Sequence, residues 1–226
     1  WSSIQLPDVQ PNWGFVHSMV EDNNGVLYAG GTGFWKSADG GNTWTSLSVP
    51  YPDTDYGGFA AIYRMTVTKD NSLIVAFSTG YDGVGPKVYK KTDEGDVWSE
   101  LFSHYSINSI VEADDGSLVF RAGLGTSGEG SVHRYYAGTV TKTFTDSVDG
   151  FGDPTAGLLK ARDGALYFIS IDKSIDLNTT TIEYTEPGHA LLAAYKSTDN
   201  GITWTKQGTL PNSWGIQAPV IEDSLG

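Results

Sequence analysis

Arg64 is the charged residue whose position is most unusual in this sequence. When four repeated hairpins are aligned on Leu27, Leu73, Leu118 and Leu166, Arg64 falls where the other copies have Ser18, Ser109 and Gly157. Burying an unpaired charge costs roughly several kcal/mol. We therefore expect the guanidinium to face a channel or reach solvent, where it could bind a ligand or take part in catalysis.

Loop aspartates are the second group that could do chemistry. Two carboxylates on either side of a glycosidic bond can act as general acid and general base. The candidates lie in predicted loops, and Asp82 joins Arg64 as a candidate catalytic residue; the full set is Asp53, Asp55, Asp82 and Asp153. Solvated turns also account for acidic loops in a chain of net charge −13.

An aromatic residue, usually followed by glycine, precedes each predicted inner strand. The set is Trp13, Tyr56, Tyr105, Phe151 and Trp214. Aromatic rings match the apolar faces of sugars, so these residues and Arg64 are the candidate ligand-binding residues. The alternative is that each ring is a spacer between repeats, because a feature present in every repeat usually serves the repeat itself.

Metal and cofactor sites are not predicted. The runs Asp22–Gly25 and Asp114–Gly116 carry oxygen ligands, but neither continues into a full calcium loop with its terminal glutamate. The four histidines, at positions 17, 104, 133 and 189, show no ligand spacing. Asn178-Thr179-Thr180, within an apparent insertion at 172–189, fits an N-glycosylation acceptor.

A repeated turn indicates where the strands that position these residues begin and end. Residues 37–44, 91–98 and 197–204 each contain an Asp, a Gly two residues later and a Trp five residues later. The Asp can accept hydrogen bonds from its own turn, and Gly supplies a positive φ. The residues assigned to these structural turns are Ser37, Asp39, Gly41, Trp44, Asp93, Gly95, Trp98, Ser197, Asp199, Gly201 and Trp204.

Hairpins recur ahead of these turns. Apolar β-formers flank polar turns in residues 16–30, 62–77, 107–120 and 156–169, which is typical of antiparallel strand pairs. A period near fifty residues predicts four-stranded propeller blades, and no segment has helical periodicity. We expect repeats at about 1–43, 44–97, 98–143 and 144–203, with a partial repeat at 204–226.

The repeated turn resembles the Asp-box, or BNR repeat, of sialidases, xyloglucanase-type glycoside hydrolases and sortilin-type receptors. The resemblance implies an all-β β-propeller, complete or part of a larger one, with part-blades at both ends and the boxes away from the active face. Tyr63-Arg64-Met65 is similar to the arginine element with which sialidases grip a substrate carboxylate. Met65 and Thr66 depart from that element, and the remaining sialidase residues are not matched.

Composition limits the classes of partner that the chain is expected to bind. With 14 basic against 27 acidic residues, the chain is unsuited to nucleic acid or anionic membranes. It has no cysteine, 28 glycines and 28 aromatic residues, which suits a turn-rich secreted or cell-surface protein. The chain begins with Trp1, so we expect a processed or excised piece.

Three functions follow from these observations. The first is an extracellular, non-catalytic binding or scaffold module that meets a glycan or protein partner on its aromatic face. The second is a portion of a sialidase-like or xyloglucanase-like glycoside hydrolase. The third is a subunit of a filament or homo-oligomer assembled by strand exchange between unpaired end strands. The first is preferred because no complete set of catalytic residues is found.

Overall fold

The computed structural model describes residues 6–7, 15–49, 60–79, 87–92, 97–104, 107–122, 130–145, 157–171 and 192–210. Within these residues every regular element is a β-strand. No helix that could cross a membrane is found among these residues.

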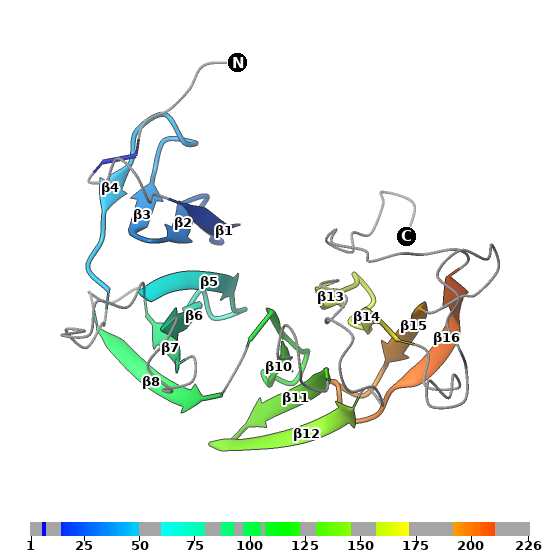
Figure 1. The fold of residues 1–226 in the computed structure, drawn as a ribbon. Helices are drawn as coiled ribbons and strands as arrows, with labels where there is room; N and C mark the ends of the chain where they lie inside the picture. Colours follow the sequence, from blue (N-terminus) through cyan, green and yellow to red (C-terminus); the bar gives the residue numbers. More distant parts are fainter. Residues whose placement is uncertain are drawn as a thin grey trace, which may run out of the picture. The chain divides into compact units, whose positions relative to one another are not determined.

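The strands form four antiparallel sheets of four strands each, and we call each sheet a blade (Figure 1). Blade 1 contains β1 (Val16–Glu21), β2 (Leu27–Gly31), β3 (Phe34–Ser37) and β4 (Thr45–Ser46). Blade 2 contains β5 (Ala60–Val67), β6 (Leu73–Thr79), β7 (Lys87–Lys91) and β8 (Trp98–Ser103). Blade 3 contains β9 (Ser109–Glu112), β10 (Leu118–Ala122), β11 (Ser131–Tyr136) and β12 (Thr139–Thr145). Blade 4 contains β13 (Leu159–Lys160), β14 (Leu166–Ile171), β15 (Leu192–Ser197) and β16 (Thr205–Leu210).

Each blade takes its strands from the chain in order, so neighbouring strands are joined as in a meander. The first two strands of each blade are the hairpins expected from the sequence, and the all-β class with four-stranded antiparallel blades is confirmed. The insertion expected at 172–189, which contains Asn178, lies outside the described residues.

The chain divides into two compact units, residues 1–107 with blades 1 and 2 and residues 108–226 with blades 3 and 4. In the first unit the apolar core lies between the two blades. Phe34 of β3 packs with Ile62, Val75 and Phe77 of blade 2. The Trp98 ring meets Phe34 edge-on at a centroid distance of 5.8 Å. Aromatic contacts of this kind contribute to the packing of blade 1 against blade 2.

The second unit repeats this arrangement with different residues. Phe144 of β12 packs against Phe168 and Tyr195 of blade 4, at ring centroid distances of 4.9 and 4.7 Å. The Trp204 ring lies edge-on to Phe168 at 4.7 Å, and its Nε1 donates a hydrogen bond to Thr143 Oγ1 of blade 3 at 3.2 Å. In both units, therefore, the repeated tryptophan of the second blade packs against the core.

A serine hydroxyl joins the inner strands of the two blades in each unit. Ser18 Oγ accepts a hydrogen bond from Met65 N at 3.1 Å, and Ser109 Oγ accepts one from Leu158 N at 2.9 Å. Both serines occupy the position that aligns with Arg64. At this position a serine hydroxyl supplies the acceptor that a backbone N–H of the neighbouring blade needs.

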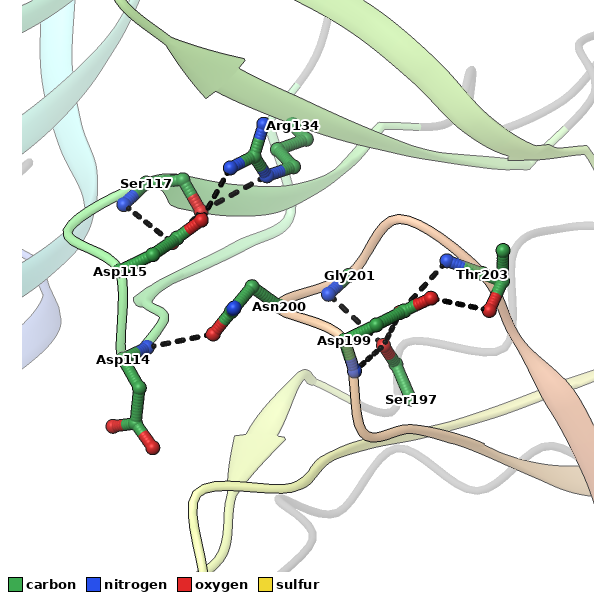
Figure 2. Close-up of polar contacts among 9 residues, drawn as sticks. All are labelled: Asp114, Asp115, Ser117, Arg134, Ser197, Asp199, Asn200, Gly201 and Thr203. Atoms are coloured by element: carbon green, nitrogen blue, oxygen red, sulfur yellow. Dashed lines mark hydrogen bonds and ion pairs between the residues drawn. The ribbon is translucent and has the colours of Figure 1, made fainter.

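An asparagine makes a second link between the two blades of each unit, just beyond the C-terminal end of β1 and of β9. Asn71 Oδ1 accepts from Asn23 N at 2.8 Å in the first unit. In the second unit Asn200 Oδ1 accepts from Asp114 N at 3.1 Å (Figure 2). Both asparagines have φ of 60°, a conformation that asparagine tolerates better than most residues. Each pair of blades is therefore linked by a serine within the first inner strand and by an asparagine just beyond the end of that strand.

The repeated Asp-Gly-Trp turn has the internal hydrogen bonds that its sequence predicts. Asp39 accepts from Thr43 N at 2.9 Å and from Ser37 Oγ at 2.8 Å. Gly41 has φ of 90° and donates its N–H to Ser37 Oγ at 2.9 Å. Donation from the Thr43 backbone and side chain lowers the pKa of Asp39 to about 2. The carboxylate thus acts as the hub of a turn.

The turn at 197–204 is built in the same way (Figure 2). Asp199 accepts from Thr203 N at 2.9 Å and from Ser197 Oγ at 2.8 Å, while Gly201 N donates to Ser197 Oγ at 2.9 Å. Burial opposes ionisation of Asp199, yet the Thr203 and Ser197 hydrogen bonds keep its pKa below the usual value. In the middle copy, Asp93 and Gly95 lie outside the described residues.

Blade 3 uses a different turn at the corresponding place. Strands β11 and β12 are joined through Ala137 and Gly138, which have φ of 48° and 82°. Two positive φ values fit a tight two-residue hairpin, so this turn closes without an aspartate that accepts its hydrogen bonds. Phe144, near the end of β12, is buried in the core of this unit.

Candidate functional site

The inner strands β1 and β5 of the first unit contain irregularities at matching places. Val16 pairs with Gly31 and Ser18 with Gly30, so His17 is an extra residue in β1. Ile62 pairs with Phe77 and Arg64 with Ala76, so Tyr63 is an extra residue in β5. Such β-bulges leave one residue unpaired and re-aim its side chain, and they are frequent at sheet edges and next to active sites.

The two bulge residues bring their rings together. His17 and Tyr63 stack with centroids 4.6 Å apart and planes 11° from parallel. Phe15 lies 6.2 Å from His17 at an angle of 33°. We call Phe15, His17 and Tyr63 the aromatic ladder. All three are exposed, with Phe15 57% and Tyr63 38% accessible.

Exposure sets the ladder apart from the other aromatic contacts. The core rings Phe34, Phe77 and Phe168 are at most 3% accessible, as expected for large apolar groups. Grouped, exposed rings mark a place where a ligand could cover them. The ladder offers flat apolar faces together with the polar Tyr63 hydroxyl and the His17 ring nitrogens.

Arg64 adds a positive charge beside the ladder. It is half-buried, and its Nη1 donates a hydrogen bond to Tyr63 O at 2.7 Å. Burial lowers the pKa of Arg64, but a guanidinium remains charged at any physiological pH. The bond to the carbonyl of Tyr63 ties the arginine to the bulge residue that presents its ring.

The structure describes one residue of the predicted catalytic and ligand-binding sets. Arg64 is the sole member of the catalytic and ligand-binding sets within the described residues. Outside them lie Trp13, Tyr56, Asp82, Tyr105, Phe151 and Trp214, and also Asp53, Asp55 and Asp153. Their roles remain predictions.

Sequence reasoning missed the ladder itself. The histidines have no metal-ligand spacing, so His17 gives no metal-site signal, and in the sequence Tyr63 stands out only as a neighbour of Arg64. The hairpin alignment contained the signal, because His17 and Tyr63 directly precede the aligned residues Ser18 and Arg64. An imidazole and a phenol at the same repeat position could have indicated a stacked pair.

The runs considered as oxygen-ligand loops form ordinary turns. Asp22 Oδ1 accepts from Asn24 N and Val26 N, each at 2.9 Å. Asp115 is hydrogen-bonded to Ser117 and paired with Arg134 (Figure 2). Among the described residues no three His, Cys, Asp or Glu side chains gather as a metal site would require.

Comparison with known proteins identifies the fold. No protein-family model and no curated protein sequence matches this chain. Solved structures do match. The glycoside hydrolase GH74 enzyme of Niastella koreensis is 20% identical with a TM-score of 0.51, over 84% of this chain and 29% of that one.

Two further similar structures are described as a gluconolactonase and as a polysaccharide lyase. The gluconolactonase XC5397 of Xanthomonas campestris is 15% identical with a TM-score of 0.55, over 87% of this chain and 62% of that one. A PL25 ulvan lyase bound to -[GlcA(1-4)Rha3S]- is 12% identical with a TM-score of 0.56, over 85% and 55%. These proteins are β-propellers, so the β-propeller class expected from the sequence is confirmed. The chain spans less than two thirds of each.

Proposed function

We propose that this chain is a carbohydrate-binding β-propeller module and that the aromatic ladder is its binding surface. The observation that carries the proposal is the stack of His17 on Tyr63, because two bulges at matching positions present both rings to solvent. A bulge leaves one residue without a pairing partner and re-aims its side chain, which is how both rings come to face away from the core.

The chemistry of the ladder favours a sugar over other small ligands. Pyranose rings have an apolar face of C–H groups that lies well on an aromatic plane, and hydroxyls at their rims that need partners. The Tyr63 hydroxyl and the His17 ring nitrogens supply such partners at the edge of the rings, and the Arg64 guanidinium is held at the main-chain carbonyl of Tyr63. The similar solved structures described as acting on sugars agree with this proposal without deciding it.

Binding to a polysaccharide panel tests the proposal. Neutral and uronate-containing polysaccharides would be immobilised and titrated with the full chain, then with Tyr63→Ala and His17→Ala. Loss of one stacking ring should weaken binding roughly ten-fold, equivalent to about 1.4 kcal/mol. Tyr63→Phe should retain most of the affinity because it keeps the ring.

Tyr136→Ala is the matched control for that titration. Tyr136 is also an exposed tyrosine, 49% accessible, but it belongs to the second unit and packs against Arg134. Its removal should leave polysaccharide binding unchanged. Equal affinity of the parent chain and Tyr63→Ala, or no polysaccharide captured at all, would exclude the ladder as a glycan site.

An enzymatic role is the alternative proposal, supported by the activities named for the similar solved structures. It requires turnover of a glycoside, a lactone or a uronate-containing polysaccharide by this chain. Arg64→Ala or Asp82→Asn should then abolish turnover while leaving the fold intact. An extracellular location belongs to both proposals and would be checked by finding the protein in the medium or on the cell surface.

A further inference from the structure

The sequence contains two Asn-Gly pairs, Asn24-Gly25 and Asn200-Gly201, in different surroundings. Asn-Gly is the pair most prone to spontaneous deamidation, since glycine has no side chain to hinder attack of its nitrogen on the asparagine side chain. We propose that Asn24 is a site of spontaneous conversion to aspartate and isoaspartate in the folded protein, and that the fold protects Asn200.

The reaction needs only water and a solvent base. The base removes the proton from Gly25 N, and this nitrogen attacks Asn24 Cγ to form a five-membered imide. The bond from Cγ to the side-chain nitrogen breaks, and that nitrogen leaves as ammonia after gaining a proton. Water then opens the imide. Hydrolysis at Cγ gives aspartate, and hydrolysis at the main-chain carbonyl gives isoaspartate.

At Asn24 little stands in the way of this movement. Asn24 and Gly25 are both exposed in the β1–β2 turn. A Cβ built on Gly25 would have a single described heavy atom within 4 Å, Glu21 Oε1 at 3.8 Å. Gly25 N donates only the local turn bond to Asp22 O at 3.0 Å. The turn can therefore reshape without displacing another blade.

At Asn200 both reacting groups are held. The side-chain oxygen accepts from Asp114 N of blade 3 at 3.1 Å (Figure 2). The attacking nitrogen, Gly201 N, donates to the buried Ser197 Oγ at 2.9 Å. A Cβ on Gly201 would lie 2.8 Å from Val119 Cγ2, so this backbone is packed against blade 3. Forming the imide would break two hydrogen bonds and move a packed segment.

Conversion at Asn24 would change the protein locally. Isoaspartate lengthens the backbone between residue 24 and Gly25 by one methylene. Asp22 Oδ1 accepts from Asn24 N and Val26 N, and the Asn23–Asn71 link is adjacent. We therefore expect the added length and the new carboxylate to loosen the contact between blades 1 and 2 at this end.

Ageing of the full chain tests the inference. Folded protein would be kept in mildly alkaline buffer, and its peptides mapped by mass spectrometry, with enzymatic methylation to mark isoaspartate. Asn24 should convert at least about ten times faster than Asn200, because Asn200 must wait for local opening. In urea the two sites should convert at similar rates.

Variants make the comparison decisive. Ser197→Ala removes the acceptor for Gly201 N and should speed conversion at Asn200, while Asn24→Gln should remove the faster conversion. If Ser197→Ala does not fold, the folded and urea-unfolded parent chains still give the answer. Equal rates at the two sites in folded protein, or an intact Asn24 there while the unfolded chain converts, would overturn the inference.

Discussion

His17 and Tyr63 show how a local backbone irregularity can decide what a side chain does. In a regular inner strand, alternate residues pack toward the neighbouring blade, as Val20 and Met65 do in the core of the first unit. A bulge adds one residue and turns that side chain out of the alternation. The ladder is therefore a property of the strand register as much as of the residue types.

Gly41 and Gly201 occupy the same position in two copies of the repeated turn, so the cost of an alanine substitution can be compared between them. Alanine at either site is strained, because φ is 90° and 79°. A Cβ on Gly41 would make ordinary contacts with Leu27 and Trp44 at 3.6 and 3.9 Å, whereas on Gly201 it would clash with Val119 at 2.8 Å.

Both substitutions should therefore destabilise the protein, by about 1–2 kcal/mol for Gly41→Ala. Gly201→Ala should cost roughly 1–3 kcal/mol more because of overpacking. Urea unfolding midpoints of the two variants check this ordering. Equal losses of stability would mean that φ strain alone sets the cost and that the Val119 contact is easily relieved.

At the scale of the strand, the links through Ser18 and Ser109 predict local effects on the blade pairs. Ser18→Ala leaves Met65 N without its acceptor, and an unsatisfied, partly buried amide costs about 1–3 kcal/mol. Hydrogen exchange at Met65 should accelerate in this variant while Leu158 keeps its protection.

Ser109→Ala should produce the reverse pattern, with Leu158 exposed to exchange and Met65 protected. Ser99→Ala, at an exposed position of β8, serves as the neutral control. Acceleration at both amides in either variant would contradict the idea that each serine stabilises only its own pair of blades.

The hairpins are predictable from sequence because their signals are local. Asp115-Gly116 and Asp163-Gly164 place a positive φ between two runs of β-formers, and turn chemistry depends on few residues. The serine links are beyond such reasoning, since the partners of Ser18 and Ser109 lie 47 and 49 residues away. Small residues at that position were visible, but their acceptor role required the neighbouring strand.

The bulges at His17 and Tyr63 escape sequence reasoning for a related reason. A bulge is defined by two residues opposite one on the partner strand, so the pairs Val16–Gly31 and Ser18–Gly30 must be known before His17 is recognised. Arg64 was found because it breaks a repeat pattern. The ladder did not stand out because aromatic residues are common in buried strands.

At the scale of the whole molecule, the carboxylates of the turns predict how the protein responds to acid. The pKa of Asp39 is lowered to about 2 by its turn. Hydrogen bonds from Lys90 and Thr68 hold the pKa of Asp70 well below its usual range. A carboxyl with a depressed pKa favours the folded state above its unfolded pKa of about 4. That stabilisation disappears as the pH falls through the folded value.

The midpoint temperature of thermal unfolding should therefore decrease as the pH is lowered from about 4 to about 2. Tryptophan fluorescence on heating, repeated across this range, measures the midpoint. The double variant Asp39→Asn and Asp199→Asn should start lower at neutral pH and show a shallower fall. A midpoint that stays constant over this window would contradict the role given to the turn carboxylates.

The most direct test of the central claim is ring-resolved NMR of the full chain during titration with a polysaccharide fragment that it binds. If the aromatic ladder is the glycan site, the ring signals of Phe15, His17 and Tyr63 shift together with one dissociation constant, and those of Tyr136 stay in place. Saturable binding that leaves the three ladder rings unshifted would show that the glycan is bound elsewhere and would contradict the account.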